Sequence, residues 1–385
     1  MGRMLHFRKR VIIMIPVSIP YVAINQKKYV NDCLKRNWIS AFGKYDSLLC
    51  KKFSAFVGSK FASTCSNGTV AIHLALLAAG VKKGDEVILP NFNGPYALFA
   101  CSYVSATPVL IDIDDSWDID IDELKKAISK KTKAIIVPHL YGIPTKLIEI
   151  AKYCKSKNII VIEDCAEAHG AKENQSMVGS IGDIGCFSFY ANKIIASGEG
   201  GIITTSNKSF FKKIEYYKNQ TFNSGPIKTF RHKEPGYNYR MSDLHCAIAY
   251  SHLEEIDHIL EERNKIIALY KKHLPKYASF FQMHKDGCSN VNWVTTFQLP
   301  KKLSKYRNKL ELFLTENNIQ VRRYFATMDK QPFLKKMLHR KIGDLKKSNQ
   351  ISNSGIYLPT YIGIQEKKIK KVCLQINNFF DGIGI

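Results

Sequence analysis

The stretch that decides the expected fold class is Phe187-Ser-Phe-Tyr-Ala-Asn-Lys-Ile-Ile-Ala-Ser-Gly-Glu-Gly-Gly201. Aromatic and polar residues alternate from Phe187 to Tyr190, which predicts a strand. Glycines then allow a tight turn into a second apolar strand, Ile202 to Thr205. Lys193 follows the first strand, and we expect it to be held rigidly at the end of that strand. The alternative is one more surface lysine.

A second strand end lies upstream. Asn158 to Asp164 is a continuous β-branched run that closes on two acids, as in a buried parallel strand with a functional carboxyl end. A carboxylate and a lysine on separate strand ends are what pyridoxal phosphate (PLP) requires: the lysine forms a Schiff base, and the acid keeps the pyridine nitrogen protonated. A helix N-cap is the alternative role for Asp164.

A candidate anion site precedes both strands. Ser66 to Thr69 are cap-type residues and glycine, and the Ala- and Leu-rich segment after them predicts a helix that ends at Gly80. Free N–H groups and the positive end of a helix dipole suit a phosphate.

These segments together resemble a known family. The motifs, in order, are Ser-Asn-Gly-Thr-Val-Ala (66–71), Glu-Asp-Cys-Ala-Glu-Ala-His-Gly-Ala (163–171), the Lys193 stretch and Gly-Tyr-Asn-Tyr-Arg-Met-Ser-Asp (236–243). Their order and spacing resemble the PLP-dependent sugar-nucleotide aminotransferases of the DegT/DnrJ type. Flanking segments are similar to those of perosamine and viosamine synthases: Trp38-Ile-Ser, His139-Leu-Tyr-Gly and Lys330-Gln-Pro-Phe333.

Fold and domains follow as expectations. Alternating strand and helix patterns between residues 86 and 164 predict an α/β protein with a mainly parallel sheet covered by helices on both faces. The resemblance implies the fold type I of PLP aminotransferases. We expect an N-terminal extension (1–13), a large PLP-binding domain (14–255) and a smaller α+β C-terminal domain (256–385).

The resemblance also implies catalytic roles. Lys193 would carry PLP and move the proton between cofactor carbon and substrate carbon. Asp164 would pair with the pyridinium, which lowers an acid's pKa. Glu167 would lie near the ring hydroxyl of PLP, its alternative being an ordinary acid on a helix face. Three other polar residues of these segments are expected to be structural: His139, His169 and Arg240.

For the phosphate, the resemblance implies Gly68, Thr69 and Ser188. Asn238 matches a position that reaches the phosphate of a neighbouring subunit, which implies a homodimer with shared active sites.

One segment departs from the family pattern. Family members place an aromatic residue that stacks on the cofactor ring where this chain has Gly94, within Pro90-Asn-Phe-Asn-Gly-Pro-Tyr96. Either Phe92 or Tyr96 supplies the stacking, or the ring face is covered in another way.

Composition sets limits on the function. The 385 residues have a net charge of +24, but the excess is lysine dispersed along the chain, so we expect no nucleic-acid partner. Ten cysteines without a C-x-x-C pair favour reduced thiols and a cytoplasmic protein without a zinc site. No apolar run approaches the roughly 20 residues of a membrane span.

The resemblance selects the reaction as well. A related branch that dehydrates at C3 carries histidine where this chain has Lys193, so lysine favours transamination. We expect transfer of an amino group from L-glutamate to C4 of a nucleotide-linked 4-keto-6-deoxyhexose. The alternatives are C3 amination of a 3-keto sugar nucleotide and a non-catalytic basic binding protein. The nucleotide, the sugar configuration and the residue that binds the donor carboxylate stay open.

Overall fold

A computed structural model describes residues 14–222 and 229–385. The predicted N-terminal extension (1–13) lies outside the described residues, as do residues 223–228.

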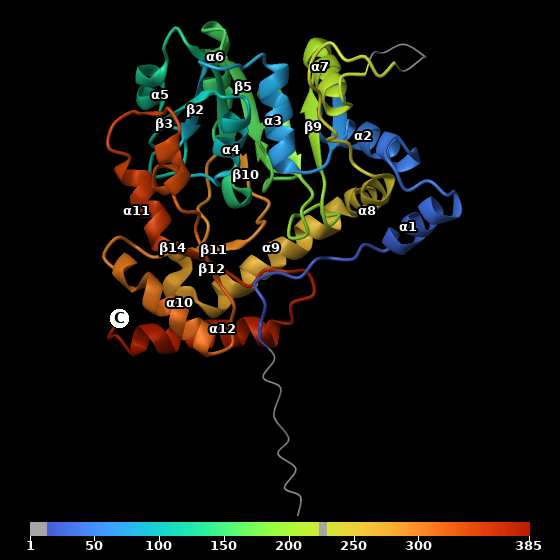
Figure 1. Ribbon diagram of the computed structural model, residues 1–385. Helices are drawn as coiled ribbons and strands as arrows, with labels where there is room; N and C mark the ends of the chain where they lie inside the picture. Colours follow the sequence, from blue (N-terminus) through green and yellow to red (C-terminus); the bar gives the residue numbers. More distant parts are fainter. Residues whose placement is uncertain (1–13, 223–228) are drawn as a thin grey trace, which may run out of the picture.

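The centre of the molecule is an eight-stranded sheet (Figure 1). In spatial order its strands are β1 (Phe61–Cys65), β9 (Gly201–Thr205), β8 (Ile184–Ser188), β5 (Ile160–Asp164), β4 (Thr132–Pro138), β2 (Glu86–Pro90), β3 (Thr107–Ile111) and β13 (Arg340–Lys341). Only β9 runs against its neighbours, pairing antiparallel with β1 and β8, and all the other pairs are parallel. The predicted mainly parallel sheet is therefore confirmed.

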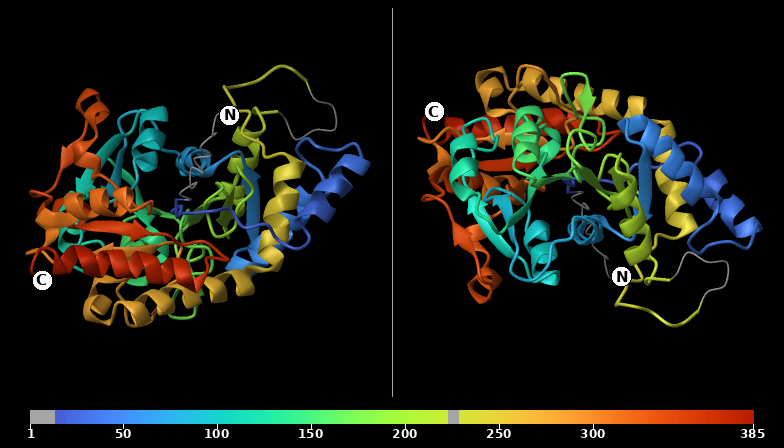
Figure 2. Two further views of the ribbon diagram at one scale, coloured as in Figure 1. Left: turned by 90° about the horizontal axis from the view of Figure 1, so that it is seen from below. Right: turned by 90° about the horizontal axis from the view of Figure 1, so that it is seen from above.

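Helices cover both faces of this sheet because its strands are apolar on both sides. In β2, Val87 and Leu89 pack into one core and Ile88 into another, since successive strand residues point to opposite faces. The first core is shared with α3 (Gly68–Ala78), α4 (Tyr96–Tyr103) and α7 (Lys208–Lys218). The opposite face is covered by α5 (Ile121–Ala127), α6 (Ile148–Ser156), α2 (Lys44–Val57) and α8 (Asp243–Glu254), as Figure 2 shows from two sides.

A long helical connection leads to a second group of elements. It consists of α8 and α9 (Ile256–His273), which meet at Glu255 and run one after the other beneath the sheet (Figure 1). Beyond them lie the antiparallel strands β11 (Thr295–Gln298), β14 (Gly355–Leu358) and β12 (Arg322–Arg323), with α10 (Arg307–Glu316) and α12 (Glu366–Asp381). None of the described helices combines the length and the apolar content that a membrane crossing needs.

Two segments pass between these groups. Ile15 forms a bridge with Ile319 and belongs to the core around α12, whereas β13 joins the edge of the large sheet through β3. The division at residue 255 stays a prediction. The remaining elements are α1 (Gln26–Lys35), β6 (Lys172–Glu173), β7 (Ser176–Met177), β10 (Cys288–Ser289), α11 (Lys346–Ser354) and the short 3-10 helices Leu140–Gly142, Pro275–Phe280, Ser304–Tyr306, Met328–Lys330 and Pro332–Lys336.

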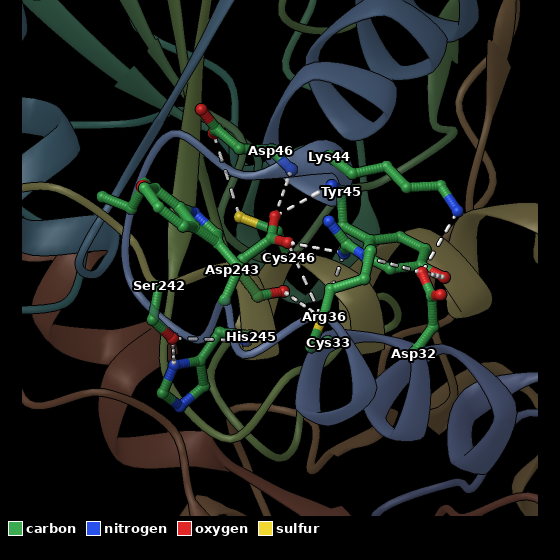
Figure 3. A network of polar contacts seen from close by, with 12 residues as sticks. Asp32, Cys33, Arg36, Lys44, Tyr45, Asp46, Ser242, Asp243, His245 and Cys246 are labelled. Atoms are coloured by element: carbon green, nitrogen blue, oxygen red, sulfur yellow. Dashed lines mark hydrogen bonds and ion pairs between the residues drawn. The ribbon is translucent and has the colours of Figure 1, made fainter.

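A buried carboxylate ties the N-terminal helices to α8. Asp243 accepts hydrogen bonds from the backbone N–H groups of Tyr45 (2.8 Å) and Asp46 (2.9 Å) in the first turn of α2 (Figure 3). Arg36, just beyond α1, lies 3.3 Å from the other carboxylate oxygen. A side chain at Gly43 would overlap the Asp243 carboxylate, so glycine is needed where α2 begins.

Candidate active site

A cavity of about 990 Å³ opens where β5 and β8 end and α3 begins. Such a place, at the carboxyl ends of parallel strands, is where open α/β sheets bind ligands. Six of the seven predicted site residues line the cavity: Gly68, Thr69, Asp164, Glu167, Ser188 and Lys193.

Lys193 lies in a turn and not at the strand end that the sequence predicted. Strand β8 stops at Ser188, and the N–H of Lys193 donates to the Tyr190 carbonyl at 2.8 Å. The ammonium group lies 3.3 Å from a carboxylate oxygen of Glu167 and 3.9 Å from the ring centroid of Trp293. Its amine is therefore held between an acid and an aromatic face.

Trp293 was missed as a site residue. Its place beside Lys193 depends on the packing of residues one hundred positions apart, and no local feature of the sequence indicates it. Its indole N–H donates to the carbonyl of Asn192 at 2.7 Å, which orients the ring against the turn that carries Lys193.

Glu167 is held from two sides. One oxygen faces Lys193, and the other accepts the backbone N–H of Tyr141 at 2.8 Å. Burial raises the pKa of Glu167, with a further rise from the Asp164 charge, while Lys193 and the Tyr141 N–H act in the opposite direction. A buried acid and an amine in this arrangement can exchange a proton.

Asp164 is the last residue of β5, as the sequence predicted. One oxygen accepts the N–H of Ala166 at 3.2 Å. This hydrogen bond resembles the one that a helix N-cap makes, which was the alternative role for Asp164. Burial raises the pKa of Asp164 against the opposing effects of the Ala166 N–H, Lys193 and His139. The lowered pKa expected from a pyridinium partner would therefore require that cation to be bound.

The start of α3 has the capped N-terminus that the sequence predicted, and its role as an anion site stays a prediction. Asn67 caps the helix by accepting the N–H of Val70 at 2.9 Å. Among the described residues, Thr69 has no hydrogen-bond partner for its N–H or its hydroxyl. A Cβ at Gly68 would come 2.8 Å from the Cβ of Ser188, so glycine lets β8 approach the helix end.

This donor set fits PLP. A helix N-terminus suits its phosphate, a lysine suits its aldehyde, and a buried carboxylate suits its ring nitrogen. The cavity brings all three together in one chain.

Asn238 is the predicted site residue that does not line the cavity. It is exposed, and its side-chain oxygen accepts a hydrogen bond from Arg240 at 2.6 Å. Arg240 also donates to Asn219 at 2.7 Å, which holds this loop in place. The role of Asn238 toward a neighbouring subunit stays a prediction.

The two histidines of the motifs are buried. The Nε2 atom of His139 lies 3.1 Å from Glu163, and the ring of His169 packs against Phe187 of β8 and Phe189, which follows the strand. In the described part of the chain, His139, Glu163 and Cys165 each have one possible metal-ligand atom, and these three atoms lie within 4.8 Å of one another. Glu163 already accepts the N–H of Gly179 at 2.7 Å, so this carboxylate has an internal structural role.

Aromatic residues, three of them within the motifs, form much of the remaining wall. They are Tyr96, Phe99, Tyr103, Tyr190, Tyr237, Tyr239, Phe325 and Tyr357. Arg322 joins them from β12 and forms no ion pair with a described residue, whereas the adjacent Arg323 pairs with Glu311 at 2.5 Å. The double arginine was visible in the sequence, but which of the two faces the cavity was not.

The sequence was also compared with known proteins. Residues 21–377 match the model of the DegT/DnrJ/EryC1/StrS aminotransferase family. The chain is 35% identical over 373 residues to GDP-perosamine synthase of Vibrio cholerae, covering 96% of this chain and 100% of that protein. It is also 35% identical to GDP-perosamine synthase of Escherichia coli O157:H7, over 95% of this chain and 98% of that protein.

A solved structure shares the fold. A putative sugar aminotransferase from Streptococcus pneumoniae in its PLP form superimposes with a TM-score of 0.88 at 22% identity, covering 97% of this chain and 100% of that one.

Proposed function

This chain belongs to the DegT/DnrJ/EryC1/StrS aminotransferase family, and we propose that it transfers an amino group from L-glutamate to C4 of a nucleotide-linked 4-keto-6-deoxyhexose. The observation that carries the proposal is the pairing of Lys193 with Glu167 in a cavity that Asp164 also lines. Lysine at this position supports transamination over dehydration.

Bound PLP supplies an electron sink for the bond changes at the carbon that gives or receives nitrogen. Thr69, Gly68 and Ser188 would hold its phosphate, and Asp164 its ring nitrogen. These contacts would leave Lys193 beside the reacting carbon.

Lys193 and Glu167 form the proton-handling pair. The two groups are 3.3 Å apart, so a proton can pass between the amine and the carboxylate. The Tyr141 N–H holds the second oxygen of Glu167, which keeps the acid in place during that exchange. The neutral amine of Lys193 would then remove a proton from the donor carbon and return one to C4 of the sugar.

The cavity leaves room for a large anionic substrate. Its volume of about 990 Å³ lies at the upper end of ligand sites. Arg322 offers a positive charge in this wall, suited to a diphosphate or a carboxylate. The dispersed basic charge of the chain also attracts such substrates.

A homodimer is part of the proposal. Asn238 is exposed and held by Arg240, which supports a role for it at the phosphate of a second copy. The ten unpaired cysteines are in keeping with a cytoplasmic enzyme.

The deciding experiment is incubation with L-glutamate and 4-keto-6-deoxyhexoses linked to GDP, dTDP or UDP. We put the GDP sugar first because the two relatives named above are GDP-perosamine synthases. The expected result is 2-oxoglutarate and a product whose NMR spectrum places the amine on C4. An amine on C3 would favour the alternative, and no turnover with bound PLP would overturn the assignment.

A further inference from the structure

The loop between β2 and α4 contains Gly94, where the family pattern that the sequence resembles implies a ring-stacking aromatic residue. In the structure Gly94 is buried beside the cavity, and its N–H donates to the Asn93 side chain at 2.6 Å. Two nearby aromatic residues could replace the missing ring, Phe92 and Tyr96.

Phe92 is not available for this role. Its ring is fully buried and packs edge to face against Trp117 at 5.5 Å, with Tyr141 and Tyr324 at 6.2 and 6.1 Å. It does not line the cavity. Moving it there would open a cavity in a close-packed core, which strongly destabilises a fold.

Tyr96 lies where a side chain from position 94 would have to go. A Cβ built on Gly94 would come 2.9 and 3.0 Å from two atoms of the Tyr96 ring, so either the added methyl group or the ring would have to shift. The ring of Tyr96 therefore occupies the space above Gly94, and glycine is what allows it to lie there.

The surroundings of Tyr96 match a cofactor contact. Tyr96 lines the same cavity as Asp164, Glu167 and Lys193. Its exposed fraction is 47%, and its ring lies over the buried backbone of Gly94. Partial burial raises the pKa of Tyr96, and the charges of Glu167 and Asp164 raise it further because they lie close to the phenol.

We propose that Tyr96 covers one face of the PLP ring in this chain, and that Gly94 is retained so that Tyr96 can reach it. The inference rests on the proposed cofactor. It assigns the ring contact to a residue two positions further along the chain than the family pattern, at the first residue of α4.

The test measures cofactor binding and not turnover. Apo-protein is titrated with PLP, and the Kd and the visible circular dichroism of the bound cofactor are recorded for the wild type and for Tyr96→Phe and Tyr96→Ala. The phenylalanine variant keeps the ring and should stay within about twofold of the wild-type Kd. Loss of one stacked ring should weaken binding roughly 5- to 100-fold in the alanine variant.

A double-mutant cycle tests the pairing of the two positions. Gly94→Ala should weaken PLP binding by displacing Tyr96, yet add little to Tyr96→Ala, because both changes remove the same contact. Phe230→Ala removes an exposed aromatic residue that does not line the cavity and should leave the Kd unchanged.

Three outcomes separate the possibilities. A wild-type Kd in Tyr96→Ala, or strictly additive effects of the two changes, would overturn the inference while leaving the proposed function intact. Failure of the wild type to bind PLP would overturn both. The melting temperature of each apo-protein controls for folding, since the half-exposed Tyr96 should contribute little to it, whereas the rise in melting temperature on adding PLP should shrink in the alanine variant.

Discussion

The ammonium group of Lys193 and the carboxylate of Glu167 face each other at 3.3 Å across the floor of the cavity, although 26 positions separate the two residues in sequence. Glu167 follows β5 and Lys193 follows β8, and these two strands are parallel neighbours. The contact therefore depends on the pairing of two strand ends, which is the arrangement that an acid–base pair on a cofactor needs.

Borohydride should trap PLP on Lys193. The visible absorbance of the purified protein should disappear on reduction, and mass spectrometry should find the cofactor on the Lys193 peptide. Lys193→Ala should retain no trapped cofactor, whereas Lys208→Ala, a change at the first residue of α7, should behave as wild type. A cofactor trapped on another lysine in the wild type would show that the assignment is wrong.

Mixing two inactive variants should restore activity if the sites are shared. Lys193→Ala and Asn238→Ala each damage one half of a site, so a mixed dimer collects both defects in one site and leaves the other intact. Up to about half of the normal activity per dimer is expected for independent sites. Absence of rescue after verified subunit exchange would contradict a shared site.

Arg322→Ala should weaken the binding of one anionic substrate. Loss of a hydrogen bond to a charged group predicts a KM increase of about 10- to 100-fold. Single-turnover measurements of the two half-reactions show which substrate is affected, glutamate through its carboxylate or the sugar nucleotide through its diphosphate. Arg323→Ala is the matched control, because Arg323 is already paired with Glu311. Equal effects of both changes would argue against a specific anion site.

Acid should destabilise the protein through His73. Burial lowers the pKa of His73 from 6.5 to about 4, so between these values the unfolded chain binds a proton that the folded chain does not. Stability is therefore retained above pH 6.5 and lost as the pH falls toward 4, by up to about 1.4 kcal/mol per pH unit. Urea unfolding of His73→Phe should show a shallower loss, while the exposed control His284→Phe should match wild type.

Gly43→Ala should destabilise the fold by about 1–3 kcal/mol, the usual cost of inserting a methyl group into filled space. Its backbone angles, φ −87° and ψ −173°, suit any residue, so the cost arises from the overlap with Asp243. In an Asp243→Ala background the same change should be nearly neutral. An equal loss of unfolding free energy in both backgrounds would show that the overlap is not the cause.

The sequence by itself was sufficient for the α/β architecture and, through the family resemblance, for six of the residues that line the cavity. A run of β-branched apolar residues, such as the one before Asp164, predicts a buried strand. In the structure that strand, β5, ends at Asp164, as predicted. The order of the motifs was enough to predict six residues that line one cavity. These features are local, since periodicity and turn chemistry are written in neighbouring positions.

Only the tertiary structure decided which side chains meet. It brought Trp293 to Lys193 across one hundred positions, directed Arg322 and not Arg323 into the cavity wall, and left Asn238 outside that wall. It also separated Phe92, which fills a core, from Tyr96, which lies over Gly94. The physical reason is that such contacts depend on how packed elements fill space, and alternation along a chain carries no information about partners far away in sequence.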